Sequence, residues 1–186
     1  MTAEKFFITA EEALLVIVDM QEKLARAMKE EIIERTIKNI TVLIELCKLY
    51  QIPVVFTEQY PKGLGKTLEQ IGNLLSEQAI EKIYFSCFGE EKFAIKIREL
   101  GRQKIILTGM ETHVCVCQTA LDFLLRHYYV FVPCDAVCSR KKQEWEIGIN
   151  LMKDAGAVIT CTETLVFQIL KKAGTDEFKK MLEFIK

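Results

Sequence analysis

The sequence has almost no excess charge, no long apolar run and only two histidines. Its 25 Lys and Arg residues nearly balance 26 Asp and Glu residues, which leaves a formal net charge of −1. Such a balance provides no basic surface of the kind that binds nucleic acid or an anionic membrane. No segment approaches the roughly 20 consecutive apolar residues that a membrane-spanning helix requires. The sequence therefore argues against a protein that works on nucleic acid or in a membrane.

The shortage of histidine also argues against a metal centre. His113 and His127 are the only two, and neither stands in an H-x-H or D-x-H pattern. Cys134 and Cys138 flank the end of an apolar run, but a zinc site there would need two further ligands nearby. No metal and no other cofactor is therefore expected.

The first residues, MTAEKFFITAEEALLVIVDM, do not resemble a secretory signal. Charged residues interrupt the apolar ones, and there is no positive start and no small-residue cleavage site. The seven cysteines are an odd number and are scattered along the chain. A cytoplasmic location, where thiols stay reduced, is the simplest interpretation of this pattern.

The chain contains a regular alternation of two kinds of segment. Half of its residues are apolar, so residues 1–186 can form one domain with a substantial core. Short runs rich in β-branched and aromatic residues predict strands at 13–20, 52–58, 82–86, 104–109, 128–134 and 157–160. Helical spacing predicts helices near 30–50, 90–100, 113–127, 141–155, 162–172 and 175–185. This alternation predicts a three-layer α/β/α fold, Rossmann-like, with a parallel sheet of roughly six strands.

One glycine-containing segment lies between the predicted elements. Residues 60–67 read YPKGLGKT. The spacing of the glycines and the lysine matches neither common phosphate-binding pattern. We therefore expect a flexible loop here.

Ligands of open parallel sheets bind beyond the carboxyl ends of the strands, so polar residues there are candidates for chemistry. Asp19 follows the apolar run LLVIV, where a buried carboxylate is costly unless it is paired. It either caps the next turn or acts as a general base. Lys82 opens the run 82–86 and is either a solvated flank or a functional residue, depending on which residues lie near it in the fold.

Cys115 falls where a strand, a turn and a helix are expected to meet, in GMETHVCVC. A helix N-terminus stabilises a thiolate and can hold an oxyanion with its free N–H groups. Cys115 is therefore a candidate nucleophile. Cys117 points about 200° away around a helix, so we expect it to pack in the core. His113 could form a dyad with Cys115, but a capping role with the ring turned away is favoured.

Taken together, these segments resemble the isochorismatase-like cysteine hydrolases, a superfamily that also contains nicotinamidases and N-carbamoylsarcosine amidases. The similarity extends over residues 12–170. The motifs that carry it, in chain order, are LLVIVDMQEKLARAM, IPVVFTEQYPKGLG, EKIYFSCFG, ILTGMETHVCVCQTALDFLL and VFVPCDAVCSR. The segment TEQYPKGLG is most similar to the subgroup of isochorismatase-domain proteins whose substrates are not established.

The resemblance implies a catalytic triad of Asp19, Lys82 and Cys115. It also implies a cis peptide bond between Met110 and Glu111, with the backbone N–H groups of Glu111 and Cys115 forming an oxyanion hole. The implied reaction is hydrolysis of a small amide or related acyl compound through a covalent thioester. The implied partners are this small-molecule substrate and further copies of the chain in a homo-oligomer.

Two departures from the superfamily narrow the interpretation. Nicotinamidases carry a D-x-H…H metal site after the second strand, whereas TEQYPKGLG contains no histidine. A nicotinamidase-like amidase would therefore have to be metal-independent. Isochorismatases proper lack the cysteine that is present here. The alternatives are a binding or scaffold protein that keeps the fold without turnover, and a redox protein with a Cys115–Cys117 disulfide.

Position alone makes four further residues candidates for the substrate-binding pocket: Gln21, Tyr60, Phe85 and Phe88. They follow the predicted strands at the edge where ligands bind. The C-terminal segment 175–185 has an apolar stripe with helical spacing. This stripe suits either an interface between subunits or packing on its own domain.

Overall fold

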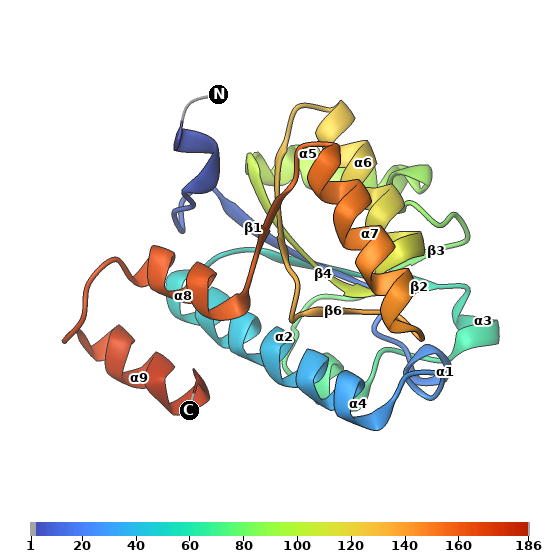
Figure 1. The fold of residues 1–186 in the computed structure, drawn as a ribbon, viewed down its shortest axis with the longest axis horizontal. Coiled ribbons are helices and arrows are strands. Elements are labelled where there is room, and N and C mark those ends of the chain that lie inside the picture. Colours follow the sequence, from blue (N-terminus) through green and yellow to red (C-terminus); the bar gives the residue numbers. More distant parts are fainter. Residues whose placement is uncertain (1–2, 186) are drawn as a thin grey trace.

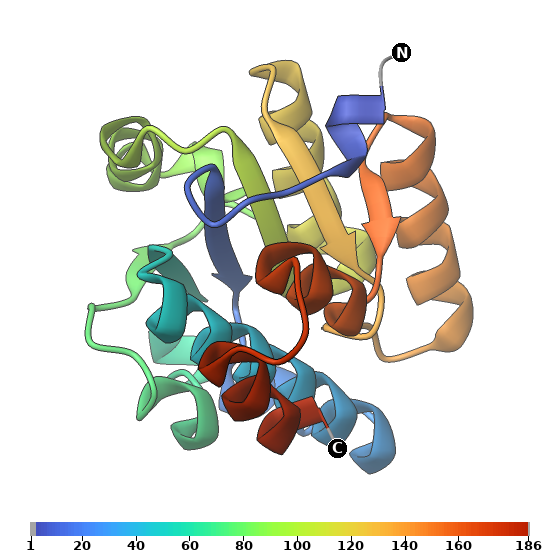
Figure 2. The same cartoon turned by 90° about the vertical axis from the view of Figure 1, so that its left-hand side faces the viewer.

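The computed structural model describes residues 3–185, which contain a seven-stranded sheet (Figure 1, Figure 2). Every strand pair described is parallel, which confirms the predicted α/β class and brings the carboxyl ends of the strands to one edge. The strand order is β3-β2-β1-β4-β5-β7, and β6 pairs with the end of β4. The strands are β1 (Ala13–Val18), β2 (Val54–Gln59), β3 (Ile80–Lys82), β4 (Lys104–Met110), β5 (Tyr129–Pro133), β6 (Val137–Cys138) and β7 (Val158–Thr160).

Helices cover both faces of the sheet and complete the three layers (Figure 1). One face carries α2 (Glu30–Tyr50), α8 (Thr162–Leu170) and α9 (Asp176–Ile185). The other face carries α5 (Glu91–Leu100), α6 (Cys117–Leu125) and α7 (Lys142–Asp154).

The central strand β1 contributes to both apolar layers. All six of its residues are buried, and successive side chains of a strand point to opposite faces. Leu15 and Ile17 belong to the cluster under α2, whereas Leu14 and Val16 belong to the cluster under α6. A continuous apolar run is therefore what a strand covered on both faces requires.

Four short elements connect the main ones: η1 (Ala3–Phe6), α1 (Glu22–Ala25), α4 (Glu69–Gly72) and η2 (Cys87–Gly89). A fifth, α3 (Pro61–Leu64), lies inside segment 60–67, so the expectation of a flexible loop there is wrong. Proline at the first helical position favours this turn of helix. The segment is also tied down, because Thr67 donates its backbone N–H to Glu58 at 2.7 Å.

The third strand differs from its predicted position. It spans Ile80–Lys82, so Lys82 ends the strand instead of opening it. Beyond it the chain bends, and the carbonyl oxygens of Tyr84 and Phe85 each lie 3.2 Å from Lys82 Nζ. The backbone curls around a buried ammonium group that needs acceptors, and this prevents the strand from continuing to residue 86. The two-residue strand β6 is additional to the six that the sequence predicts.

The C-terminal helix packs on its own chain. Met181 on α9 is buried, and the ring of Phe178 lies 6.3 Å from that of Phe167 on α8. Figure 2 shows α9 beside α2 and α8. The apolar stripe of residues 175–185 is therefore used within the domain. Within residues 3–185, no helix combines the length and apolar content needed to cross a membrane.

Candidate active site

Asp19 directly follows β1 and is fully buried. Its backbone φ is +50°, in the left-handed region that aspartate tolerates better than most residues. Its carboxylate accepts a hydrogen bond from Thr57 Oγ1 at 2.7 Å and another from Lys82 Nζ at 2.6 Å. Both carboxylate oxygens therefore have a donor, one from β2 and one from β3.

Lys82 brings a buried positive charge to the same point. Its side chain is 0% exposed, as is that of Asp19. Besides Asp19, its ammonium group donates to Gln59 Oε1 at 2.7 Å and to the carbonyl oxygens of Tyr84 and Phe85. A buried ion pair is stable only where its remaining donors and acceptors are also satisfied. These contacts meet that condition.

Cys115 lies in η3, a π-helical turn (Thr112–Val116) between β4 and α6. The sequence predicts one continuous helix over 113–127, but the structure begins it with this wider turn. Turns of the π type occur often at functional sites. Cys115 is 5% exposed, so the nucleophile candidate is almost enclosed.

A helix N-terminus is expected to stabilise a Cys115 thiolate and so to lower the pKa of the thiol, but in the structure this pKa is raised. Burial raises the pKa of the Cys115 thiol most, the charge of Asp19 and its hydrogen bond with the thiol raise it further, and Lys82 lowers it only in part. Burial acts to lower the pKa of Lys82, but Asp19 and the thiols of Cys87 and Cys115 bring it above its ordinary value. At neutral pH Lys82 is therefore an ammonium and Cys115 a protonated thiol.

The turn before Cys115 is set by one close backbone approach. Gly109 has a φ of +112°, and a Cβ atom there would lie 2.0 Å from the carbonyl oxygen of Val18. Only glycine allows β4 to pass the end of β1 at this distance. The peptide bond between Met110 and Glu111, which follows, is cis.

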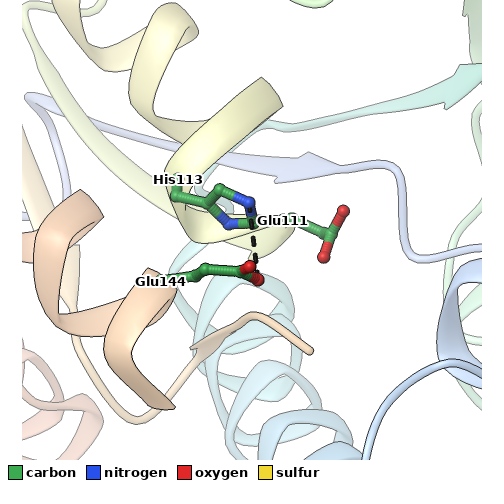
Figure 3. A group of neighbouring side chains, drawn as sticks. All are labelled: Glu111, His113 and Glu144. Atoms are coloured by element: carbon green, nitrogen blue, oxygen red, sulfur yellow. Dashed lines mark ion pairs between the residues drawn. The ribbon is translucent and has the colours of Figure 1, made fainter. Parts of the chain in front are cut away.

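His113 faces away from Cys115. Its Nδ1 lies 3.0 Å from Ser139 Oγ, and its Nε2 lies 3.7 Å from Glu144 Oε2 (Figure 3). The ring is therefore held by the segment before α7 and by α7 itself. A capping role for His113 stays a prediction. Cys117 is buried in the apolar cluster under α6, in agreement with its expected packing role.

The side-chain amide of Gln21 is bonded within the chain. Its Nε2 donates to the carbonyl oxygens of Gln59 at 3.0 Å and Gly65 at 2.7 Å, and its Oε1 accepts from the Gln59 N–H at 2.8 Å. The side chain is fully buried. The amide of Gln21 therefore holds the segment after β2, and its contact with a substrate stays a prediction.

Phe88 packs against other aromatic side chains. Its ring packs edge-on against Phe93 and Phe123, with centroids 5.2 Å and 4.7 Å away, and the Arg126 guanidinium lies 4.3 Å from its centroid. Arg126 follows the last residue of α6, and Phe88 is a partly buried residue packed against the apolar cluster under that helix, so its contact with a substrate stays a prediction. Tyr60 and Phe85 are each 55% exposed and stay predicted contacts.

Three functional candidates were not found from the sequence. Thr57 bonds to Asp19, Gln59 bonds to Lys82, and Cys87 is buried with its sulfur 3.3 Å from Thr119 Oγ1 and 3.8 Å from Thr57 Oγ1. Burial raises the pKa of the Cys87 thiol to about 11. The available signal was the polar triplet TEQ at the end of an apolar strand, since such residues are rarely buried without a purpose.

Comparison with known proteins shows which family the chain belongs to. The isochorismatase domain family matches residues 13–164. Isochorismatase family protein 1A of Dictyostelium discoideum is 36% identical over 175 residues, which cover 91% of this chain and 84% of that one. The chain belongs to the isochorismatase family. The family match includes Asp19, Lys82 and Cys115.

Two solved structures extend this comparison. The MAR1 ribonuclease of Caenorhabditis elegans is 32% identical to this isochorismatase-family chain, with a TM-score of 0.88 over 96% of this chain and 92% of that one. The YcaC gene product of Escherichia coli, described as an octameric hydrolase of unknown specificity, has a TM-score of 0.88 over 96% and 90%. At 18% identity it shows the fold alone. The expected isochorismatase-like fold is confirmed.

Proposed function

We propose that this isochorismatase-family protein is a cysteine hydrolase that cleaves a small amide or related acyl compound. The observation that carries the proposal is the fully buried Asp19–Lys82 pair, whose charges both act on the Cys115 thiol. Burying two charges costs free energy that a well-packed apolar pair would not. Convergence of a base, a cation and a nucleophile at the carboxyl edge of a parallel sheet is the arrangement that covalent acyl transfer needs.

The proposed first half-reaction forms a thioester. Asp19 takes the proton of Cys115 Sγ while the sulfur attacks the acyl carbon, and the carbonyl electron pair moves to oxygen. The backbone N–H groups of Glu111 and Cys115 hold the resulting oxyanion. As the carbon–nitrogen bond breaks, Asp19 returns its proton to the departing amine. Lys82 stays charged and balances the negative charge throughout.

The second half-reaction uses water. Asp19 removes a proton from a water molecule, whose oxygen attacks the thioester carbon. The carbon–sulfur bond then breaks, and the thiolate recovers the proton from Asp19. The products are a carboxylic acid and the free enzyme.

A hydrolysis screen tests this proposal. Small amides and carbamoyl compounds are incubated with the protein, and released amine or ammonia is measured. Cys115→Ala should reduce turnover to background, whereas Cys117→Ala, a change to a buried cysteine two residues away, should retain it. Wild-type rates with Cys115→Ala would exclude the covalent mechanism. Intact mass spectrometry of a slow substrate should show an acyl adduct on Cys115.

The same screen separates the alternatives. A binding or scaffold protein would turn over none of the compounds, and a redox protein would show a Cys115–Cys117 disulfide by intact mass under mild oxidation. Short RNA belongs in the screen because the Caenorhabditis elegans relative is named a ribonuclease. The net charge of −1 and the nearly enclosed thiol favour a small substrate.

We also propose that the protein forms a homo-oligomer, supported by the octameric description of the Escherichia coli structure. Light scattering after size-exclusion chromatography measures this directly. A mass of one chain at micromolar concentration would contradict it.

A further inference from the structure

Figure 3 shows a second cluster of titratable side chains, Glu111, His113 and Glu144, none of which belongs to the proposed triad. Each residue offers one ligand atom, and the three atoms lie within 4.8 Å of one another. Glu111 and His113 come from the start of η3, and Glu144 comes from α7. Carboxylate oxygens and imidazole nitrogens together are typical ligands of zinc and related ions.

The imidazole is oriented as a ligand would be. With the Nδ1 proton of His113 donated to Ser139 Oγ at 3.0 Å, the lone pair of Nε2 is directed toward Glu144. Histidine ligands of metals usually donate their other ring N–H in this way, which fixes both the tautomer and the ring.

Each carboxylate is also held by only one of its oxygens. Arg140 Nε lies 2.8 Å from Glu111 Oε1, and Lys141 Nζ lies 3.2 Å from Glu144 Oε1. The other oxygen of Glu144, Oε2, is buried and accepts no hydrogen bond from any residue between 3 and 185. The polar group that the chain brings to this oxygen is His113 Nε2 at 3.7 Å, which is too far for a hydrogen bond, so an ion between the two atoms would give the oxygen a partner.

From these contacts we propose that Glu111, His113 and Glu144 bind one divalent transition-metal ion of the Zn²⁺ class. Ligand atoms of tetrahedral zinc lie about 3.4 Å apart, given metal–ligand distances of about 2.0–2.2 Å. His113 Nε2 and Glu144 Oε2 are 3.7 Å apart, and the Glu111 oxygen lies within 4.8 Å of both. Rotation of the side chains toward one another would bring the three atoms to the zinc spacing. Three protein ligands leave one position for water. The ion would join α7 to the turn that carries Cys115.

The backbone beneath the cluster is fixed. A Cβ atom on Gly148 of α7 would lie 2.9 Å from both His113 Cα and the carbonyl oxygen of Thr112. Helix α7 therefore contacts η3 backbone to backbone, and the ligand-bearing elements cannot slide apart easily. Glu111 and His113 follow β4, so the cluster differs from the metal site of nicotinamidases, which follows the second strand. It includes none of the proposed catalytic side chains.

Calorimetric titration of the reduced full-length protein with Zn²⁺ tests the proposal. The wild type and Cys115→Ala should both bind one ion with the same affinity, because the site does not use that thiol. Mn²⁺, which disfavours thiolate ligands, serves as a second probe and should compete for the same site. Absence of binding, or loss of binding in Cys115→Ala, would overturn the proposal.

Three variants and a matched control locate the site. His113→Asn and Glu144→Gln remove ligands and should weaken binding at least as much as Ser139→Ala, for which loss of the ring's partner predicts about a 10–100-fold decrease. Glu146→Gln, which changes a carboxylate on the same helix that pairs with Lys142, should bind like the wild type. Equal affinity in all four variants would place the ion elsewhere.

Two further readouts keep the result clear. Thermal unfolding without metal shows whether each variant folds. A rise in melting temperature with Zn²⁺ in the wild type, Cys115→Ala and Glu146→Gln, but not in His113→Asn and Glu144→Gln, supports the site independently. Neither measurement involves a substrate, so the metal site can fail while the proposed hydrolase activity stands, and the reverse.

Discussion

Asp19 combines two tasks that are usually given to different residues. It neutralises Lys82 at 2.6 Å, and it is the only proposed acceptor for the Cys115 proton. Because the thiol is protonated in the resting state, its proton is still present for Asp19 to take during the attack itself. The reactivity of Cys115 should therefore depend on Asp19 in two opposite ways.

The variant Asp19→Asn should show both effects. Loss of the negative charge removes a cause that raises the pKa of Cys115, while Lys82, which lowers it, stays in place. Alkylation of Cys115 by iodoacetamide at neutral pH should therefore become faster, although hydrolysis is lost. Peptide mass spectrometry over time measures the labelling. Asp176→Asn, whose side chain is exposed, should change neither rate, and slower labelling in Asp19→Asn would contradict the assignment of the pKa shift.

The residues at the centre of the site could be predicted, but their supports could not. Asp19, Lys82 and Cys115 stand in recognisable motifs. Gln21 and Phe88 stand in equally suitable places, yet their side chains turn to Gln59 and Phe123. Side-chain direction is set by partners on other strands and helices, and this information is distributed along the chain.

Among the secondary-structure elements, those with long apolar patterns were the most predictable. Strands β1, β2, β4 and β5 fall within or close to the expected runs. β3 ends at Lys82 instead of beginning there, because the buried ammonium group draws the following backbone around it. β6 has two residues, which is too short for an alternating hydrophobic pattern. The π-helical turn at Cys115 depends on hydrogen-bond spacing, which amino-acid periodicity does not encode.

The contact between α7 and η3 provides a test of this turn. Gly148→Ala should lower the free energy of unfolding by about 1–3 kcal/mol, because the new methyl group overlaps the backbone of η3. Turnover should fall as well, since η3 carries Cys115. Urea denaturation and the hydrolysis assay measure the two effects. Gly72→Ala, where no atom lies within 4 Å of the added carbon, should leave stability unchanged or raise it by up to about 1 kcal/mol.

For the molecule as a whole, the cysteines determine the response to alkaline pH. Burial raises the thiol pKa of Cys47, and raises that of Cys138 to about 12 and that of Cys87 to about 11. In the unfolded chain these thiols ionise near pH 8.5, at roughly their ordinary pKa. Above that pH the unfolded state binds fewer protons than the folded state, so stability must fall as pH rises.

The expected loss is about 1.4 kcal/mol per pH unit for each such thiol once the pH exceeds about 8.5. Urea denaturation under reducing conditions, compared near neutral pH and about two units higher, measures it. Cys47→Ala should be less stable near neutral pH but should show a shallower slope, by about one proton, in the alkaline range. A stability that is flat across this range would mean that the buried thiols ionise in the folded protein.

The pairing of Asp19 with Lys82 joins residues 63 positions apart in the chain. At about 5–20 residues per second, a ribosome takes roughly 3–13 s to synthesise the segment between them. During this interval β1 ends in a carboxylate that cannot enter an apolar interior without its counter-ion. The end of β1, a central strand of the sheet, must therefore stay solvated until the edge strand β3 has been synthesised. The charge pair that is proposed to take part in hydrolysis thus also sets the earliest time at which this part of the nascent chain can fold.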